Sequence, residues 1–166
     1  TLAGNGIVNI SVLAGDLETT GLVSANGSGN VLLDAAAGAV TLGDNVLSGT
    51  GDISITGNSV TQNANITTAG AGTVSVVADN GSITMTGTAT TTTNTGNITY
   101  SATLDAALIL LTSTSGNIFV TADSDTNGTG AISDETVAET ANIVTTGRAS
   151  LSAGAGIGDT GPADIN

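Results

Sequence analysis

A five-residue pattern, in which glycine is followed by alternating polar and apolar positions (Gly-x-φ-x-φ, φ apolar), recurs along the whole chain. Alternation with a period of two predicts a strand with one buried face. Recurrence at a nearly constant interval predicts a solenoid in which each repeat forms one coil. The pattern begins, at intervals of 23, 22, 21, 24, 20 and 31 residues, at Gly6, Gly29, Gly51, Gly72, Gly96, Gly116 and Gly147.

The aligned repeats keep one kind of residue in each column. The position six residues after glycine is nearly always small, which predicts a tight corner between stacked coils, and the position between the two apolar columns is mostly polar. Two residues after glycine stand Val8, Val31, Ile53, Val74, Ile98, Ile118 and Ala149. Four residues after glycine stand Ile10, Leu33, Ile55, Val76, Tyr100, Val120 and Leu151.

Further apolar runs predict one or two more short strands per coil, so that each turn has two or three. A second strand is expected at Val40 with Leu42, Val60, Ile83 with Met85, and Leu108 with Leu110. A weaker third run is seen at Val46-Leu47, Ala64 with Ile66, and Ile143-Val144. Asn-Gly and other glycines at the corners are expected to supply the positive φ of sharp turns.

We therefore predict an all-β fold, a single-stranded parallel β-helix (β-solenoid) of about seven coils of roughly 20–24 residues. One solenoid segment is expected to span residues 1–166, with an insertion in the coil 116–146. A β-sandwich also offers short alternating strands, but it does not require identity of columns at a period near 22 residues.

Composition narrows the picture of the interior. Trp, Cys and His are absent, and Tyr100 and Phe119 are the only aromatic residues, so small and β-branched side chains must fill a narrow core. The regular recurrence of Val, Ile and Leu argues against a disordered chain.

Charge excludes two classes of partner. Fourteen acidic residues stand against Arg148 alone, for a net charge of −13, so we expect no binding to nucleic acid and no docking on anionic lipid. The longest apolar run, 106–111, is interpreted as one short strand and is far too short to cross a membrane, so no membrane insertion is expected.

Catalysis is difficult to build from these residues, and we predict that the chain is not an enzyme. No His, Cys or Lys is present, so Ser-His and Cys-His nucleophile pairs cannot form. Paired carboxylates could act on a glycoside, and the densest acidic group is Asp134, Glu135 and Glu139. A carbohydrate-active β-helix is therefore the third function considered. The alternative interpretation of this acidic group is a solvated loop.

The chain also contains a candidate calcium-binding loop. Asp123, Asp125 and Asn127 alternate, Gly128 stands at the sixth place and Asp134 at the twelfth, as in loops that bind Ca²⁺ through oxygen ligands. The pattern departs from such loops because Asp replaces the final Glu and no helices are expected beside it. The alternative is a polar turn rich in Asp and Asn. We therefore expect no cofactor, unless calcium binds this loop.

Several segments resemble a known family. The segments 51–57, 81–87 and 116–122 resemble repeats of large bacterial filamentous-haemagglutinin-like adhesins, and the segment 151–158 looks like a phrase common in those exoproteins. The resemblance implies a right-handed β-helical shaft, exported by two-partner secretion or an autotransporter route. It also implies an extracellular or bacterial cell-surface location. Shafts of this kind hold adhesive or toxic tips away from the cell.

The function expected from the sequence is that of a structural or adhesive shaft segment of a large secreted or cell-surface bacterial protein. Because the chain opens on Thr1, we expect it to be excised from a much longer repeat protein. The expected partner is a receptor or glycan of a host or neighbouring cell. The alternative is a subunit that self-associates end to end through exposed strand edges into an extracellular filament.

Overall fold

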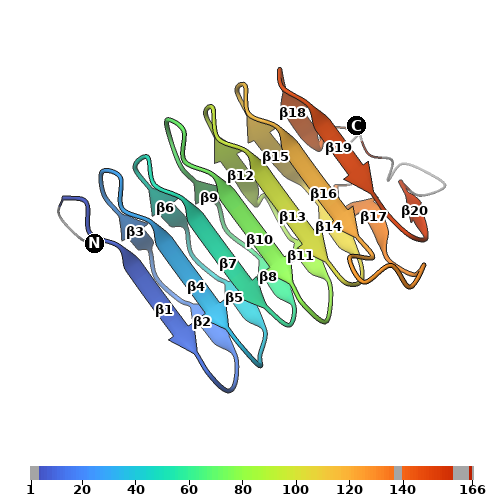
Figure 1. The fold of residues 1–166 in the computed structure, drawn as a ribbon, viewed down its shortest axis with the longest axis horizontal. Helices are drawn as coiled ribbons and strands as arrows, with labels where there is room; N and C mark the ends of the chain where they lie inside the picture. Colours follow the sequence, from blue (N-terminus) through green and yellow to red (C-terminus); the bar gives the residue numbers. More distant parts are fainter. Residues whose placement is uncertain (1–3, 137–139, 159–164, 166) are drawn as a thin grey trace.

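The computed structural model describes residues 4–136, 140–158 and 165. Within these residues the strands β1 to β20 form three parallel sheets, and the chain passes through them in turn as it winds along the molecule. Figure 1 shows the coils stacked side by side, with the N-terminal coil at one end and the C-terminal coil at the other. The predicted all-β parallel β-solenoid is confirmed.

The first sheet, sheet A, contains the five-residue strands that follow the repeating glycine. Its members in spatial order are β1 (Val8–Val12), β4 (Val31–Ala35), β7 (Ile53–Gly57), β10 (Val74–Ala78), β13 (Ile98–Ala102), β16 (Ile118–Ala122) and β19 (Ala149–Ser152). Each strand pairs in parallel with the next, and both predicted apolar columns are in register along the sheet.

The second and third sheets, sheets B and C, form the other two sides of each coil. Sheet B contains β2 (Leu17–Thr19), β5 (Val40–Leu42), β8 (Val60–Gln62), β11 (Ile83–Met85), β14 (Ala106–Leu108), β17 (Ala131–Asp134) and β20 (Gly156–Ile157). Sheet C contains β3 (Val23–Ala25), β6 (Val46–Ser48), β9 (Ile66–Thr67), β12 (Thr90–Thr93), β15 (Leu110–Ser113) and β18 (Ile143–Thr145). The described residues thus make six turns and the first two strands of a seventh.

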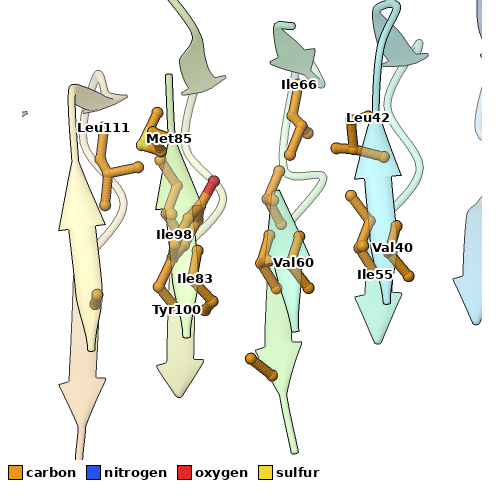
Figure 2. Packing of buried hydrophobic residues seen from close by; sticks show 14 of the residues in the cluster. Val40, Leu42, Ile55, Val60, Ile66, Ile83, Met85, Ile98, Tyr100 and Leu111 are labelled. Atoms are coloured by element: carbon orange, nitrogen blue, oxygen red, sulfur yellow. The ribbon is translucent and has the colours of Figure 1, made fainter. Parts of the chain in front are cut away.

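Alternate side chains of these strands fill the interior. Leu33, Ile55, Val76 and Tyr100, which occupy one column of sheet A, are completely buried. Figure 2 shows side chains from the three sheets meeting inside the coils, among them Val40, Leu42 and Ile66. Because the interior is this narrow, a single layer of aliphatic side chains closes it, as the composition indicates.

One detail of the sequence interpretation is wrong. The apolar run 106–111 is not one strand, because the chain turns from sheet B to sheet C at Ile109, between β14 and β15. The expected positive φ is found at corner glycines such as Gly27 and Gly128, which both follow Asn, and at Gly87, but at none of the glycines that begin the repeat.

The repeating glycine is required by close stacking. A Cβ added at Gly96 or Gly116 would collide with the backbone carbonyl of the same glycine in the preceding coil. Inward-facing hydroxyls from the last strand positions of sheet C then satisfy these carbonyls. Ser48 donates to Gly29 O at 2.7 Å, and Ser113 donates to Gly96 O at 3.0 Å. This corner is therefore both tightly packed and fully hydrogen-bonded.

In several coils the residue just before the strand of sheet A contributes to a second, external ladder. Asp52 N donates to Asn30 Oδ1 at 2.9 Å, and Thr73 N donates to Asp52 Oδ1 at 2.8 Å. The same bond joins Asn97 to the Asn117 backbone at 2.8 Å. Each of these side chains caps a backbone N–H of the following coil, which explains why Asn and Asp recur outside the hydrophobic columns.

Candidate functional site

The turn between β16 and β17 contains three of the four residues of the predicted calcium loop. The Asp123 carboxylate accepts hydrogen bonds from the backbone N–H of Asn127 at 2.8 Å and of Gly128 at 3.0 Å. Asn127 Nδ2 donates to Asp125 Oδ2 at 2.8 Å. Asp123 and Thr126 have φ of 68° and 60°, a region that Asp tolerates better than most residues. The three predicted residues thus lie together in one exposed turn.

Asp134 lies elsewhere. It is the last residue of β17, and the strand alternation turns its side chain toward the interior, where it is 6% exposed. Its carboxylate accepts hydrogen bonds from Thr136 N at 2.6 Å, from Thr136 Oγ1 at 2.7 Å and from Asn142 Nδ2 at 2.8 Å. Burial alone would raise the pKa of Asp134, but these hydrogen bonds outweigh burial and hold the pKa below its ordinary value.

The four predicted ligands are therefore not brought to one point. No group of three or more acidic side chains positioned for a metal ion is present among the described residues. The Asp123 carboxylate is occupied by the backbone of its own turn, and Asp134 by Thr136 and Asn142. Calcium binding by the turn alone stays a prediction.

The acidic group considered for glycoside chemistry is also divided. Asp134 points inward and is buried, whereas Glu135, the next residue, is exposed. Glu139 lies outside the described residues. The two described carboxylates therefore face different environments, and the acid–base pair that a glycosidase needs is not seen in this part of the chain.

A hollow in the described surface lies over the corner between sheets B and C. In the fifth coil a single residue, Ile109, joins the two sheets, whereas the fourth coil uses the four residues 86–89. The corner is therefore recessed between longer neighbours, and the hollow has a volume of about 500 Å³. Its lining surface is mostly apolar, with Ile109, Leu110 and Ala141 as apolar residues and Glu135 as its single charged group.

A polar network that the sequence analysis did not detect lies inside the solenoid. Gln62 of β8, Thr91 of β12 and Tyr100 of β13 come from three successive coils and three different sheets, and all are completely buried. Tyr100 OH donates to Gln62 Oε1 at 2.6 Å and lies 2.6 Å from Thr91 Oγ1. Gln62 Nε2 donates to Thr91 Oγ1 at 3.1 Å. The Tyr100 side chain is seen among its apolar neighbours in Figure 2.

The three side chains are joined in a closed ring of hydrogen bonds. Within it the Thr91 hydroxyl has two partners, the Tyr100 oxygen at 2.6 Å and Gln62 Oε1 at 3.4 Å. Burial raises the pKa of Tyr100 far above its ordinary value, although the hydrogen bond with Thr91 offsets part of this effect. The phenol is therefore protonated at all physiological pH values and acts as a structural donor, without an accessible reacting partner.

Comparison of the chain with protein-family models, with curated proteins and with solved structures found no match. The described residues contain no helix able to cross a membrane. The fold itself defines the class: the chain is a β-helical repeat protein, built from parallel coils whose columns are conserved from one turn to the next.

Proposed function

We propose that this chain is a structural shaft segment of a large secreted or cell-surface bacterial protein, where it mediates adhesion or spacing, and that it has no catalytic activity. The observation that carries the proposal is the continuity of the three ladders. Sheets A and B each contain seven strands and sheet C contains six. The strands of sheet A pair with those of the next coil from their first residue to their last. A shaft requires this uniformity, because each coil must transmit position and load to the next.

The hydrogen-bond partners of the polar side chains support the same function. The buried polar groups described above are bonded to one another or to backbone, and the exposed Asn and Asp side chains at strand starts cap the backbone of the next coil. Described carboxylates such as those of Asp52, Asp105 and Asp134 therefore have structural partners. The family resemblance of the repeats supports an extracellular or cell-surface location and a receptor or glycan of another cell as the partner.

The shaft is tested by removing whole coils. Deletion of residues 30–51 joins Gly29 to Asp52 and removes β4, β5 and β6, so β1 can pair with β7 in the same register. The shortened shaft should fold cooperatively and lose about 4.8 Å of length. The matched control deletes only residues 30–40, about half a coil, which takes all three ladders out of phase and should prevent folding.

The same pair of deletions tests the function in the gene product that contains this chain. Antibodies raised against the purified chain should label intact source bacteria or their medium, and the whole-coil deletion should preserve both display and cell attachment. Labelling only after permeabilisation would refute the location. Loss of attachment in the whole-coil variant, although it is folded and displayed, would show that residues 30–51 hold a binding site and are not a spacer. Release of reducing sugars from polysaccharides by the chain would refute the absence of catalysis.

A further inference from the structure

The hollow over the corner between sheets B and C lies where the length of this corner changes most abruptly. The corner has three residues in each of the first three coils (20–22, 43–45 and 63–65), four in the fourth (86–89), one in the fifth (109) and eight in the sixth (135–142). The shortest and the longest corner are therefore neighbours. The short corner leaves the recess, and the long corner contributes residues to its rim.

Three successive coils line the hollow. The fourth coil contributes Thr88 and Thr90, and the sixth contributes Glu135. Between them the fifth coil forms the floor with Ile109, which is 8% exposed, and with Leu110, which is half-buried. The hollow thus combines an apolar floor with hydroxyl groups and one carboxylate at its sides, which is the composition of many binding pockets.

Buried hydrogen bonds fix the rim of the hollow to its floor. Asn142, at the end of the sixth corner, is completely buried, and its Nδ2 donates to Ile109 O at 3.0 Å and to Asp134 Oδ1 at 2.8 Å. The Asn142 carbonyl accepts from Leu111 N at 2.8 Å. Near the start of the same corner, the Thr136 hydroxyl donates to Asp134 Oδ2 at 2.7 Å. The described part of the rim is therefore held in place before any ligand binds, which lowers the cost of binding.

The charge at the hollow is negative. Glu135 is the single charged residue in the described lining, and its side chain is exposed. Its backbone N–H donates to Leu108 O at 2.8 Å, which fixes the residue at the end of β17. The only basic residue of the chain, Arg148, stands between β18 and β19, at the corner between sheets C and A. A cation that complements Glu135 at this hollow is therefore supplied by a partner.

Lysine and arginine side chains match this combination of groups, because they lay an aliphatic stem along apolar surface and keep the charged head in water. The volume of about 500 Å³ lies within the range of about 300–1,000 Å³ that is typical of ligand pockets, so an apolar residue fits beside the basic one. The two aromatic residues of the chain, Tyr100 and Phe119, do not line the hollow, so it has no ring on which a sugar would stack.

We propose that this hollow binds a short segment of a partner protein in which a lysine or arginine side chain stands beside an apolar one. The stem and the apolar neighbour cover Ile109 and Leu110, and the charged group pairs with Glu135. The proposal rests on the adhesive shaft proposed above, since it specifies the chemistry of that shaft's partner. Residues 30–51, which the coil deletion removes, do not line the hollow, so the two tests fail independently.

An NMR titration of the isotope-labelled chain with acetyl-Leu-Arg-Leu-amide tests the proposal. An ionic strength of about 0.15 M, where the Debye length is about 8 Å, screens the general attraction between a cationic peptide and an acidic chain. Saturable shifts are expected at the backbone amides of Thr88, Ile109 and Leu110. Acetyl-Leu-Glu-Leu-amide, which lacks the cation, and acetyl-Ser-Arg-Ser-amide, which lacks the apolar side chains, should each bind at least about tenfold more weakly.

Two variants with matched controls locate the binding. Glu135→Gln should weaken binding of the arginine peptide about fivefold, as expected for the loss of a partly exposed ion pair. Glu18→Gln, at an exposed position of β2, changes the net charge equally and should leave the affinity unchanged. Thr88→Trp places a large ring at the hollow and should abolish the shifts at Ile109, whereas Thr20→Trp, at the same corner of the first coil, should not.

Several results would overturn the proposal. These are shifts that are absent or grow without saturation, equal weakening by Glu135→Gln and Glu18→Gln, and equal binding of the glutamate and arginine peptides. Shifts at the hollow with a cellulose- or chitin-derived oligosaccharide, and none with the arginine peptide, would assign the hollow to a glycan and would also overturn it.

Discussion

The buried ring of Gln62, Thr91 and Tyr100 gives a prediction whose magnitude follows from the structure. Tyr100→Phe removes one hydroxyl and leaves the apolar contacts of the ring in place. The Gln62 Oε1 atom then loses its 2.6 Å donor, and the Thr91 hydroxyl loses its partner at 2.6 Å. Both partners are completely buried, so water cannot replace the lost bonds.

Leaving a buried polar group without a partner costs about 1–3 kcal/mol. For a chain of 150–250 residues, a loss of 1 kcal/mol lowers the melting temperature by about 2–4 °C, so Tyr100→Phe should lower it by about 2–12 °C. Replacing the whole ring in the triple variant with Gln62→Leu and Thr91→Val should recover part of the loss, because no member of the ring is then left unpaired. The recovery should be incomplete, because the carbonyls of Ala64 and Thr90 lose the hydrogen bonds that Gln62 Nε2 donates to them at 3.0 and 3.1 Å.

Thermal and urea unfolding followed by circular dichroism measure these changes. Thr112→Val, an outward-facing position of sheet C, is the matched control and should change the free energy of unfolding by no more than about 0.5 kcal/mol. The reasoning would be refuted by a Tyr100→Phe variant as stable as the parent chain. It would also be refuted by a triple variant that loses the sum of the three single losses.

Three further predictions follow from the corner, the buried carboxylate and the polar turn. Gly96→Ala should destabilise the fold by about 1–3 kcal/mol through collision with a backbone carbonyl, whereas Gly21→Ala, which meets no atom within 4 Å, should be nearly neutral in urea unfolding. The Asp134 carboxylate, whose pKa is lowered by folding, stabilises the chain fully above its ordinary pKa of 3.8 and loses this effect as the pH falls through the lower folded value. Asp134→Asn should therefore lower the melting temperature at pH 7, and the difference should shrink in acid. If calcium fills the turn, it should raise the melting temperature; Asp125→Ala should abolish the rise and Asp134→Asn, which changes a residue outside the turn, should not.

The fold was predictable because the same alternating pattern recurs several times along the chain. A single alternating segment such as 53–57 could belong to a sandwich or a solenoid, but seven in register leave one architecture. The prediction failed where neighbouring elements share a run of one kind of residue. Nothing in the apolar run 106–111 marks Ile109 as a corner, because the corner is created by the coils on either side.

The candidate site was harder to predict because spacing along the chain does not give direction in space. Asp123 and Asn127 are close in sequence and share one turn, as expected. Asp134 stands at the right distance along the sequence, yet β17 begins between it and the turn, and alternation points its carboxylate inward. Spacing rules taken from helical calcium loops do not include that strand.

Departures from the columns are the more informative signal in a repeat of this kind. All coils pack in the same way. A residue that differs in type from the others in its column therefore indicates a contact that the other coils do not make. Tyr100 is the only aromatic residue in an aliphatic column, and it meets Gln62, the only amide in its own column of sheet B.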